Sequence, residues 1–314
     1  MTIDTLVVVN PASAGGRTGR RWSEIATLML DAGLDFETHL TTVPGDATRA
    51  VRAGLRAGRS RVVAVGGDGT LNEVVNGFFD ERGSPLAPDA VLALLPSGTG
   101  GDFRKAAGIP GDPRGAIAIL TAGATRRIDA GRIDFEDGER RHFINIADCG
   151  LGGAVVARVN RSRFKSGGAR GSAVFLWQSL ATVWTFAGGD VAVRVDTHRF
   201  EGAVQSVVVA NGRYFGGGMH IAPHALLDDG VFDVIIVEAR SRSRTLRGLP
   251  SVYRGRHLGE PGVTALRGAE VRIETRGTPL LFDVEGEQIG TTPATLTCLK
   301  GAIRICAPAA NGAA

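Results

Sequence analysis

The chain has 314 residues, which is more than one hydrophobic core usually supports, so its length favours two domains. Hydrophobic residues make up 43% and charged residues 22%, a balance typical of a globular protein, which argues against disorder. The net charge of +4 comes without a long run of Lys or Arg, so we expect an anionic substrate or a membrane surface as partner and no nucleic acid.

The first 130 or so residues alternate between β-branched runs and stretches with helical spacing. We expect strands at Thr5–Val9, Asp35–Leu40, Arg61–Val65 and Val91–Leu95. We expect helices at Arg20–Asp31, from an N-cap at Asp46 through Leu55, from about Leu71 to Phe79, and after an N-cap at Asp112 with Pro113 as its first residue. This alternation predicts a doubly wound α/β domain, with helices on both faces of a parallel sheet.

The pattern changes near residue 132. Ile133–Phe135 and His142–Ala147 flank a turn at Asp137-Gly138, which predicts a hairpin. Further strands are expected at Val191–Val195, Ala203–Ala210, Phe232–Val237, Val271–Thr275, Leu280–Val284 and Ala302–Ile305. Only two helices are expected here, at Ser172–Phe186 and Ser243–Arg254. We therefore predict an α/β domain over residues 1–132 and a β-rich domain, a β-sandwich, over residues 133–301.

Cysteine use and the N-terminus bear on location. Cys149, Cys298 and Cys306 are scattered and odd in number, which fits a reducing compartment better than a disulfide framework. No basic segment precedes the first apolar run, and no window holds 18 uninterrupted apolar residues, so we expect neither a signal peptide nor a membrane span. A cytoplasmic protein is expected.

The motif with the most chemical content follows the third expected strand. It reads Gly66-Gly67-Asp68-Gly69-Thr70-Leu71-Asn72-Glu73 and opens a helix. Glycines let the backbone approach a phosphate, and a helix N-terminus offers free N–H groups to an anion. An Asp among phosphate-binding groups is favourable if Mg²⁺ lies between them. The alternative is a tight turn whose glycines serve packing alone.

Two further loops follow neighbouring strands. Pro96–Phe103 again combines glycines, hydroxyls and an acid, and Asn10–Arg17 is small and polar. All three loops should meet at the carboxyl edge of the sheet. The Gly-Lys-Ser/Thr of a P-loop is absent, and Asn-Pro stands where a dinucleotide fingerprint would begin.

In order along the chain, these motifs resemble the diacylglycerol kinase catalytic domain shared by bacterial lipid kinases and by sphingosine and ceramide kinases. The resemblance rests on Asn10-Pro11, Gly66–Glu73, Gly98–Phe103, Asp129-Ala130-Gly131, Gly216–Gly218 with Pro223, Leu227–Gly230, Glu285-Gly286-Glu287 and Pro293. The first glycine block is also similar to NAD kinases and phosphofructokinases, whereas the later blocks favour lipid kinases.

The resemblance implies transfer of the γ-phosphoryl group of ATP, with Mg²⁺, to a hydroxyl of a lipid such as diacylglycerol. It implies a strand near residues 302–306 that returns to the first domain, and a lipid head group bound between the domains. The implied nucleotide site consists of Asn10, Pro11, Ala12, Ser13, Ala14, Thr41, Gly67, Asp68, Gly69, Thr70, Leu71, Asn72, Glu73 and Thr99.

The resemblance also implies metal and phosphate contacts. Asp102 and Asp129 would join Asp68 around Mg²⁺, and Lys165 would contact phosphate, unless it is a solvated surface cation. A structural Mg²⁺ would be bound by the Asp229 side chain and the carbonyls of Leu226 and Val231; a plain β-turn is the alternative.

Two positions depart from the family pattern. Gly101 stands where Asn is usual, and Glu285 stands where an Asp acts as general base. The extra methylene of Glu285 moves the carboxylate by about 1.5 Å, so either the site has adjusted or the kinase is weak.

The implied partner is a lipid at the membrane surface, reached by peripheral contact with the inner face; a homodimer is left open. Trp177 and Trp184, on one expected helix, could line a lipid groove or cover the β-domain core. Two other functions stay open: a kinase of a soluble substrate, such as NAD kinase, and a non-catalytic nucleotide or lipid sensor.

Overall fold

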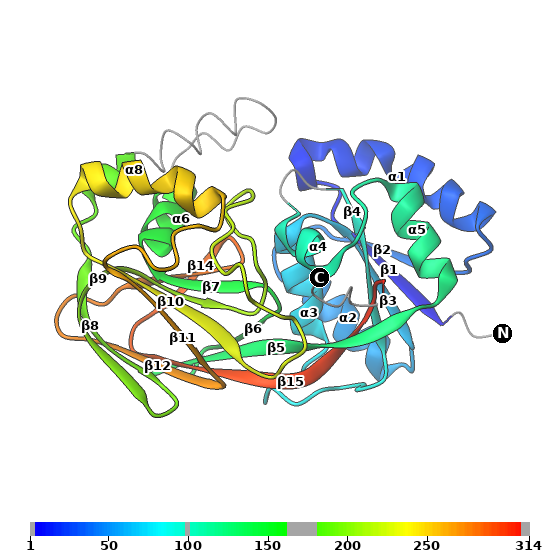
Figure 1. Ribbon diagram of the computed structural model, residues 1–314. Coiled ribbons are helices and arrows are strands. Elements are labelled where there is room, and N and C mark those ends of the chain that lie inside the picture. The colour runs from blue at the N-terminus through cyan, green and yellow to red at the C-terminus, as the bar shows by residue number, and fades with distance from the viewer. Residues whose placement is uncertain (1–3, 98–100, 162–180, 309–314) are drawn as a thin grey trace. The chain divides into compact units, whose positions relative to one another are not determined.

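The computed structural model describes residues 4–97, 101–161 and 181–308. The chain forms two compact units: unit 1 comprises Met1–Ala130 and Lys300–Ala314, and unit 2 comprises Gly131–Leu299. Both passages of the chain between units lie inside long strands, β5 (Thr125–Phe135) and β15 (Ala294–Cys306) (Figure 1).

Unit 1 is built on a parallel sheet in the order β15–β4–β3–β1–β2. Its other strands are β1 (Thr5–Val9), β2 (Glu37–Leu40), β3 (Arg61–Gly66) and β4 (Val91–Pro96). Every residue of β1 is buried, as expected for a central parallel strand with helices on both faces. The end of β15 pairs with β4, Arg304 opposite Val91, so the C-terminal strand completes this sheet.

The helices of unit 1 pack on this sheet (Figure 1). They are α1 (Ser13–Asp31), α2 (Asp46–Arg56), α3 (Asp68–Gly77), α4 (Asp102–Ala107) and α5 (Pro113–Ala122). The Asp112 cap is confirmed, because its Oδ1 accepts the Gly115 N–H at 2.8 Å. The expected Asp46 cap is wrong: the cap position is Gly45, at φ 79°, and the Asp46 carboxylate instead accepts the Thr42 N–H.

Unit 2 is β-rich. Its sheet runs β14–β13–β7–β9–β8–β12–β15, with β10 also on β9, β11 on β10, and β5 paired with β6. The strands are β6 (Arg140–Phe143), β7 (Ile146–Gly150), β8 (Gly189–Val195), β9 (His198–Ala210), β10 (Phe232–Glu238), β11 (Val263–Gly268), β12 (Glu270–Thr275), β13 (Leu281–Val284) and β14 (Glu287–Thr291). The predicted hairpin is present as β5 and β6, and Gly138 takes φ 89° in its turn.

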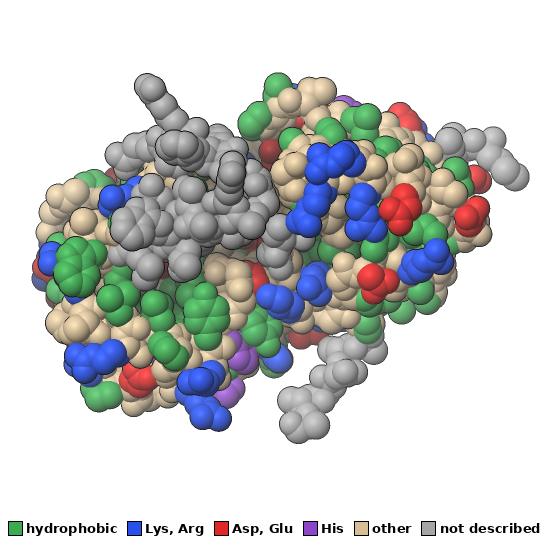
Figure 2. All heavy atoms as spheres, turned by 90° about the horizontal axis from the view of Figure 1, so that it is seen from above, with side chains coloured by type: hydrophobic (Ala, Val, Ile, Leu, Met, Phe, Trp, Pro, Cys, Tyr) green, Lys and Arg blue, Asp and Glu red, His purple; other side chains and the backbone are tan. Residues whose placement is uncertain are grey.

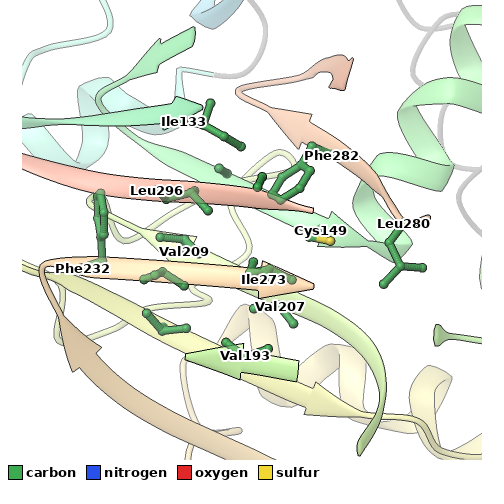
Figure 3. Close-up of a cluster of buried hydrophobic side chains, with 14 of the residues drawn as sticks. Ile133, Cys149, Val193, Val207, Val209, Phe232, Ile273, Leu280, Phe282 and Leu296 are labelled. Atoms are coloured by element: carbon green, nitrogen blue, oxygen red, sulfur yellow. The ribbon is translucent and has the colours of Figure 1, made fainter. Parts of the chain in front are cut away.

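Alternate residues of these strands form the main core of unit 2. Figure 3 shows side chains from several strands, among them Val193, Val207, Ile273, Phe282 and Leu296, directed toward one another. A smaller cluster, with Ile146, Val208 and Ile235, covers the opposite face of β7, β9 and β10. The two clusters explain the unbroken apolar run of β9, which is buried on both faces.

Two helices of unit 2, α6 and α8, lie wholly within the described residues. α8 (Arg242–Tyr253) agrees with the expected helix to within one residue at each end. α6 (Leu151–Arg161) was not expected, and most of the helix expected over Ser172–Phe186 lies outside the described residues. Within the described ranges, no helix is both long enough and apolar enough to cross a membrane.

Candidate active site

Side-chain hydrogen bonds join the three loops at the carboxyl edge of the unit 1 sheet. Asn10, directly after β1, donates from Nδ2 to Thr70 Oγ1 at 3.1 Å, in the first turn of α3, which follows β3. Thr18 of α1 donates to both the carbonyl and the hydroxyl of Ser97, after β4, at 3.1 and 2.8 Å. Thr41 joins this edge through its N–H, which donates to the Val9 carbonyl. The predicted meeting of these loops is therefore present.

The loop after β1 curls into a left-handed turn. Asn10 accepts the Ala12 N–H at its Oδ1, and its carbonyl accepts the Ser13 hydroxyl. Ala14, Gly15 and Gly16 then take φ values of 53°, 66° and 81°. This conformation costs little for glycine and more for Ala14, so the turn is a specific backbone shape at the edge where phosphates would bind.

The loop after β3 is tightly built against the start of α3. Gly67 occupies the cap position, and a Cβ on Gly66 would lie 2.5 Å from Thr70 Oγ1. A side chain at residue 66 would therefore displace the hydroxyl that Asn10 binds. Here the glycine serves packing, while the first N–H groups of α3 have the orientation that favours an anion.

Asp68 lies at the centre of this edge. Its Oδ2 accepts the N–H groups of Gly101 and Asp102 at 2.9 and 3.3 Å. Burial raises the pKa of Asp68 above its usual value, and the nearby negative charge of Asp102 raises it further, against the lowering effect of the backbone N–H groups. Asp102 is buried and paired with Lys105 Nζ at 3.0 Å.

These contacts allow a test of the predicted Mg²⁺. Two neighbouring carboxylates offer the hard oxygen ligands that Mg²⁺ prefers, and a cation would relieve their repulsion, so Asp68 and Asp102 fit the ion. Asp129 is fully buried and accepts the Gly301 N–H of β15 at 2.7 Å. Across residues 4–97, 101–161 and 181–308, no three or more His, Cys, Asp or Glu side chains converge as a metal site.

Some predicted nucleotide residues have structural contacts. Glu73 Oε2 accepts the Ala47 N–H at 3.2 Å and so caps α2 from α3. Asn72 is fully buried and accepts from Asn76, and Leu71 belongs to the core. Thr99 and Lys165 lie outside the described residues.

Glu285 lies in the tight turn between β13 and β14 of unit 2. It is half-buried and takes φ 55°, a left-handed conformation that is unusual for a residue with a side chain. Its Oε1 accepts the N–H groups of Ile144 and Asn145 at 2.7 and 2.6 Å. The bend between β6 and β7 is itself fixed, because Asn211 Nδ2 donates to the Ile144 carbonyl at 2.9 Å. The carboxylate is thus held by two donors in a rigid backbone.

A buried acid pair lies beside this turn. Asp148 of β7 and Asp283 of β13 are direct cross-strand partners. Asp148 Oδ2 accepts the Gly152 N–H at 2.8 Å at the start of α6, and Asp283 Oδ1 accepts the Gly286 N–H at 2.7 Å. Burial, with the charge of Asp283, raises the pKa of Asp148 to about 7, and burial raises that of Asp283 to about 6. Sequence reasoning missed Asp148, because only the strand register shows its partner.

The Asp229 carboxylate of the predicted structural Mg²⁺ site contacts other residues of unit 2, and the ion itself stays a prediction. One carboxylate oxygen accepts the Val231 N–H at 3.2 Å, and the other is paired with Arg267. Arg267 also approaches Asp233 at 3.6 Å. The Arg267 guanidinium supplies positive charge beside Asp229 in this structure.

Two family models match the chain. Residues 4–133 match the diacylglycerol kinase catalytic domain, and residues 145–307 match the YegS C-terminal NAD kinase beta sandwich-like domain. A diacylglycerol kinase of Staphylococcus epidermidis is 30% identical over 305 residues, covering 96% of this chain and 91% of its own. A protein of Pseudomonas putida named as a YegS-like lipid kinase is 36% identical over 256 residues, covering 80% of this chain and 81% of its own.

Solved structures agree with these matches. A diacylglycerol kinase from Bacillus anthracis superposes with a TM-score of 0.70 at 21% identity, covering 98% of both chains, which shows the shared fold. A second chain from that bacterium superposes with a TM-score of 0.76 at 25% identity, covering 98% of this chain and 96% of its own.

Proposed function

This chain belongs to the diacylglycerol kinase family, and we propose that it transfers the γ-phosphoryl group of ATP to a hydroxyl group of a lipid such as diacylglycerol. The observation that carries the proposal is the joined edge of unit 1, where Asn10, Thr70 and Asp68 meet at the carboxyl ends of parallel strands. Ligands of open α/β sheets bind at this edge.

Unit 1 would position the nucleotide. The N-terminus of α3 and the left-handed turn after β1 offer backbone N–H groups to phosphate oxygens, and the Asn10–Thr70 hydrogen bond fixes the two loops against each other. Asp68 and Asp102 would hold Mg²⁺, which when bound neutralises phosphate charge. Catalysis would then depend on positioning and charge, as is usual in phosphoryl transfer.

Unit 2 would supply the general base. Glu285 would accept the proton of the lipid hydroxyl, and the N–H groups of Ile144 and Asn145 would keep its carboxylate oriented. The extra methylene compared with the family's Asp is used to reach these two donors, which favours an adjusted site over an impaired one.

The test is an acceptor screen. Purified protein is incubated with radiolabelled ATP and Mg²⁺ over diacylglycerol, monoacylglycerol, a sphingoid base and NAD. We expect label in a lipid phosphate and none in NADP. Label in NADP alone would replace the proposal with a soluble-substrate kinase, and ATP binding without transfer to any acceptor would indicate a sensor.

A further inference from the structure

An arginine-rich stretch surrounds α8 in unit 2. Residues 239–256 contain six arginines and no Asp, Glu or Lys: Arg240, Arg242, Arg244, Arg247, Arg254 and Arg256. All but Arg240 are exposed. This density of one sign is unusual in a chain with 36 basic and 32 acidic residues, and it calls for an explanation other than general solubility.

The exposed arginines of α8 differ from those elsewhere in unit 2. Arg194, Arg272 and Arg276 are also exposed, yet each forms an ion pair with a glutamate on a neighbouring strand or on its own strand. Arg242, Arg247 and Arg254 form no ion pair with any acid of the described residues. Their charge is therefore available to an external partner.

The orientation of α8 is fixed by its inner face. Thr245 is buried and donates to Gln205 Oε1 of β9 at 2.8 Å. Val252, seven residues later, packs on the cluster with Val208 and Ile235. Seven residues are about two helical turns, so the two contacts lie on one side and turn the opposite side of the helix outward.

The outward face combines apolar and basic side chains in separate strips. At about 100° per residue, Arg247 and Arg254 lie almost opposite the inner face, and Leu246, Pro250 and Tyr253 form an apolar strip between these two arginines and Arg242. Tyr253 is 52% exposed, whereas large hydrophobic side chains are more often buried. The face therefore has the amphipathic layout of a helix that lies in a membrane interface.

A second exposed aromatic extends this face. Trp184 is 56% exposed, and the Arg242 guanidinium lies 5.5 Å from its ring centre. Figure 2 looks onto the side of unit 2 that carries α8, and it shows blue basic side chains interspersed with green hydrophobic ones. Trp, Tyr and Arg side by side suit the boundary between lipid head groups and acyl chains.

We propose that this face, the α8 face, is the surface by which the protein docks on a bilayer that contains anionic phospholipid. The arginines would attract the lipid phosphates, and Trp184, Leu246, Pro250 and Tyr253 would enter the head-group region. The choice of a membrane over a nucleic acid or a protein rests on the apolar strip between the arginines, on the exposed Trp184 and Tyr253 and, in part, on the proposed lipid kinase function. Docking would bring the enzyme to an acceptor that does not leave the bilayer.

The test compares two triple variants with the same loss of charge. R242Q/R247Q/R254Q neutralises the α8 face, and R194Q/R199Q/R272Q neutralises three exposed arginines on β8, β9 and β12. Binding is measured by sedimentation with vesicles of phosphatidylcholine and phosphatidylglycerol at 3:1. We expect the α8 triple to bind on the order of 100-fold more weakly and the control triple to bind like the wild type. Equal loss in both variants would overturn the proposal.

A further variant separates the contribution of the aromatic side chains to vesicle binding from that of the arginines. Trp184→Ala with Tyr253→Ala should remove the binding that persists at high salt, while the salt dependence stays, because screening acts on the arginines alone.

Binding of single-stranded RNA is measured in parallel for the wild type and the α8 triple. Loss of RNA binding in the α8 triple, with vesicle binding unchanged, would show that the face serves a nucleic acid and that the membrane proposal is wrong.

Failure of the docking surface is distinguishable from failure of the kinase function. Activity on a monomeric short-chain diacylglycerol should be the same in the wild type and the α8 triple, since none of the three arginines lies in the proposed active site. Vesicle binding that depends on the α8 face, in a protein with no kinase activity on any lipid, would retain the surface and refute the function.

Discussion

Glu285 uses its full side-chain length, and this can be tested directly. Glu285→Asp shortens the side chain by about 1.5 Å, so it should lose at least one of the N–H bonds from Ile144 and Asn145. We expect kinase activity to fall by about 100-fold or more in both Glu285→Asp and Glu285→Gln, since general base catalysis typically contributes 10²–10⁴. Higher activity in Glu285→Asp than in wild type would mean that the wild-type site is impaired.

Asp68 should be required for turnover but not for folding. Asp68→Asn keeps an acceptor for the Gly101 N–H while it removes the negative charge next to Asp102. We expect a loss of kinase activity of at least about 100-fold, with thermal stability unchanged or higher, because the buried like-charge repulsion is gone. Activity is measured with radiolabelled ATP, and stability by circular dichroism. Activity like that of wild type would remove this loop from the active site.

At the residue scale, the sequence motifs predicted which residues lie at the carboxyl edge of the unit 1 sheet better than they predicted the contacts of each residue there. Asn10, Asp68 and Thr70 were predicted from residue type and position after a strand; a hydrogen bond joins Asn10 to Thr70, and Asp68 is joined to the loop after β4 through the Gly101 N–H. Glu73, in the same motif, instead caps α2. Its role depends on a helix 26 residues earlier in the chain, and no local pattern contains that contact.

At the element scale, the pairing of β7 with β13 predicts how stability depends on pH. Asp148 and Asp283 have pKa values raised to about 7 and about 6, above their usual value near 4 in an unfolded chain. Between about pH 4 and pH 7 the folded state therefore holds protons that the unfolded state has released, and stability falls as pH rises through this range. Asp148→Asn should raise the melting temperature at pH 8 by several degrees and by a smaller amount at pH 5, where the wild type has lost only part of this stability.

A control variant separates the charge of Asp148 from its packing role. Asp148→Ala removes the acceptor of the Gly152 N–H and should destabilise the protein at both pH values. A melting temperature of Asp148→Asn that falls below wild type at pH 8 would contradict the raised pKa.

Elements with a regular pattern were predictable, and irregular ones were not. The parallel strands of unit 1 and α8 follow from apolar runs and helical spacing. α6 was missed because it begins directly after β7, with Gly152 and Gly153 in its first turn. Those glycines are required by contacts outside the helix, since a Cβ on Gly152 would lie 2.0 Å from Asp148 Oδ2 and one on Gly153 2.1 Å from the Leu281 carbonyl. Tertiary contact overrides local propensity there.

At the scale of the whole molecule, β15 contributes to two cores, and substitutions along it should act on different units. Ile305 is buried in unit 1 and Leu296 in unit 2. Ile305→Ala should cost about 2–5 kcal/mol and raise amide hydrogen exchange in β3 and β4. Leu296→Ala should have a similar cost but raise exchange in β8 and β12. Identical exchange maps for the two variants would contradict the division into two units.

The return of β15 to unit 1 has a consequence for synthesis on the ribosome. The strand that pairs with β4 follows the whole of Gly131–Leu299 in the chain, so the first part of unit 1 is translated before the neighbour that pairs with β4. At roughly 5–20 residues per second, the edge of β4 stays open for roughly 10 to 30 s while Gly131–Leu299 is synthesised. An unpaired strand edge is a site for wrong pairing with other chains. The edge of β4 is therefore open to wrong pairing during this interval, whereas in the folded protein β15 pairs with it.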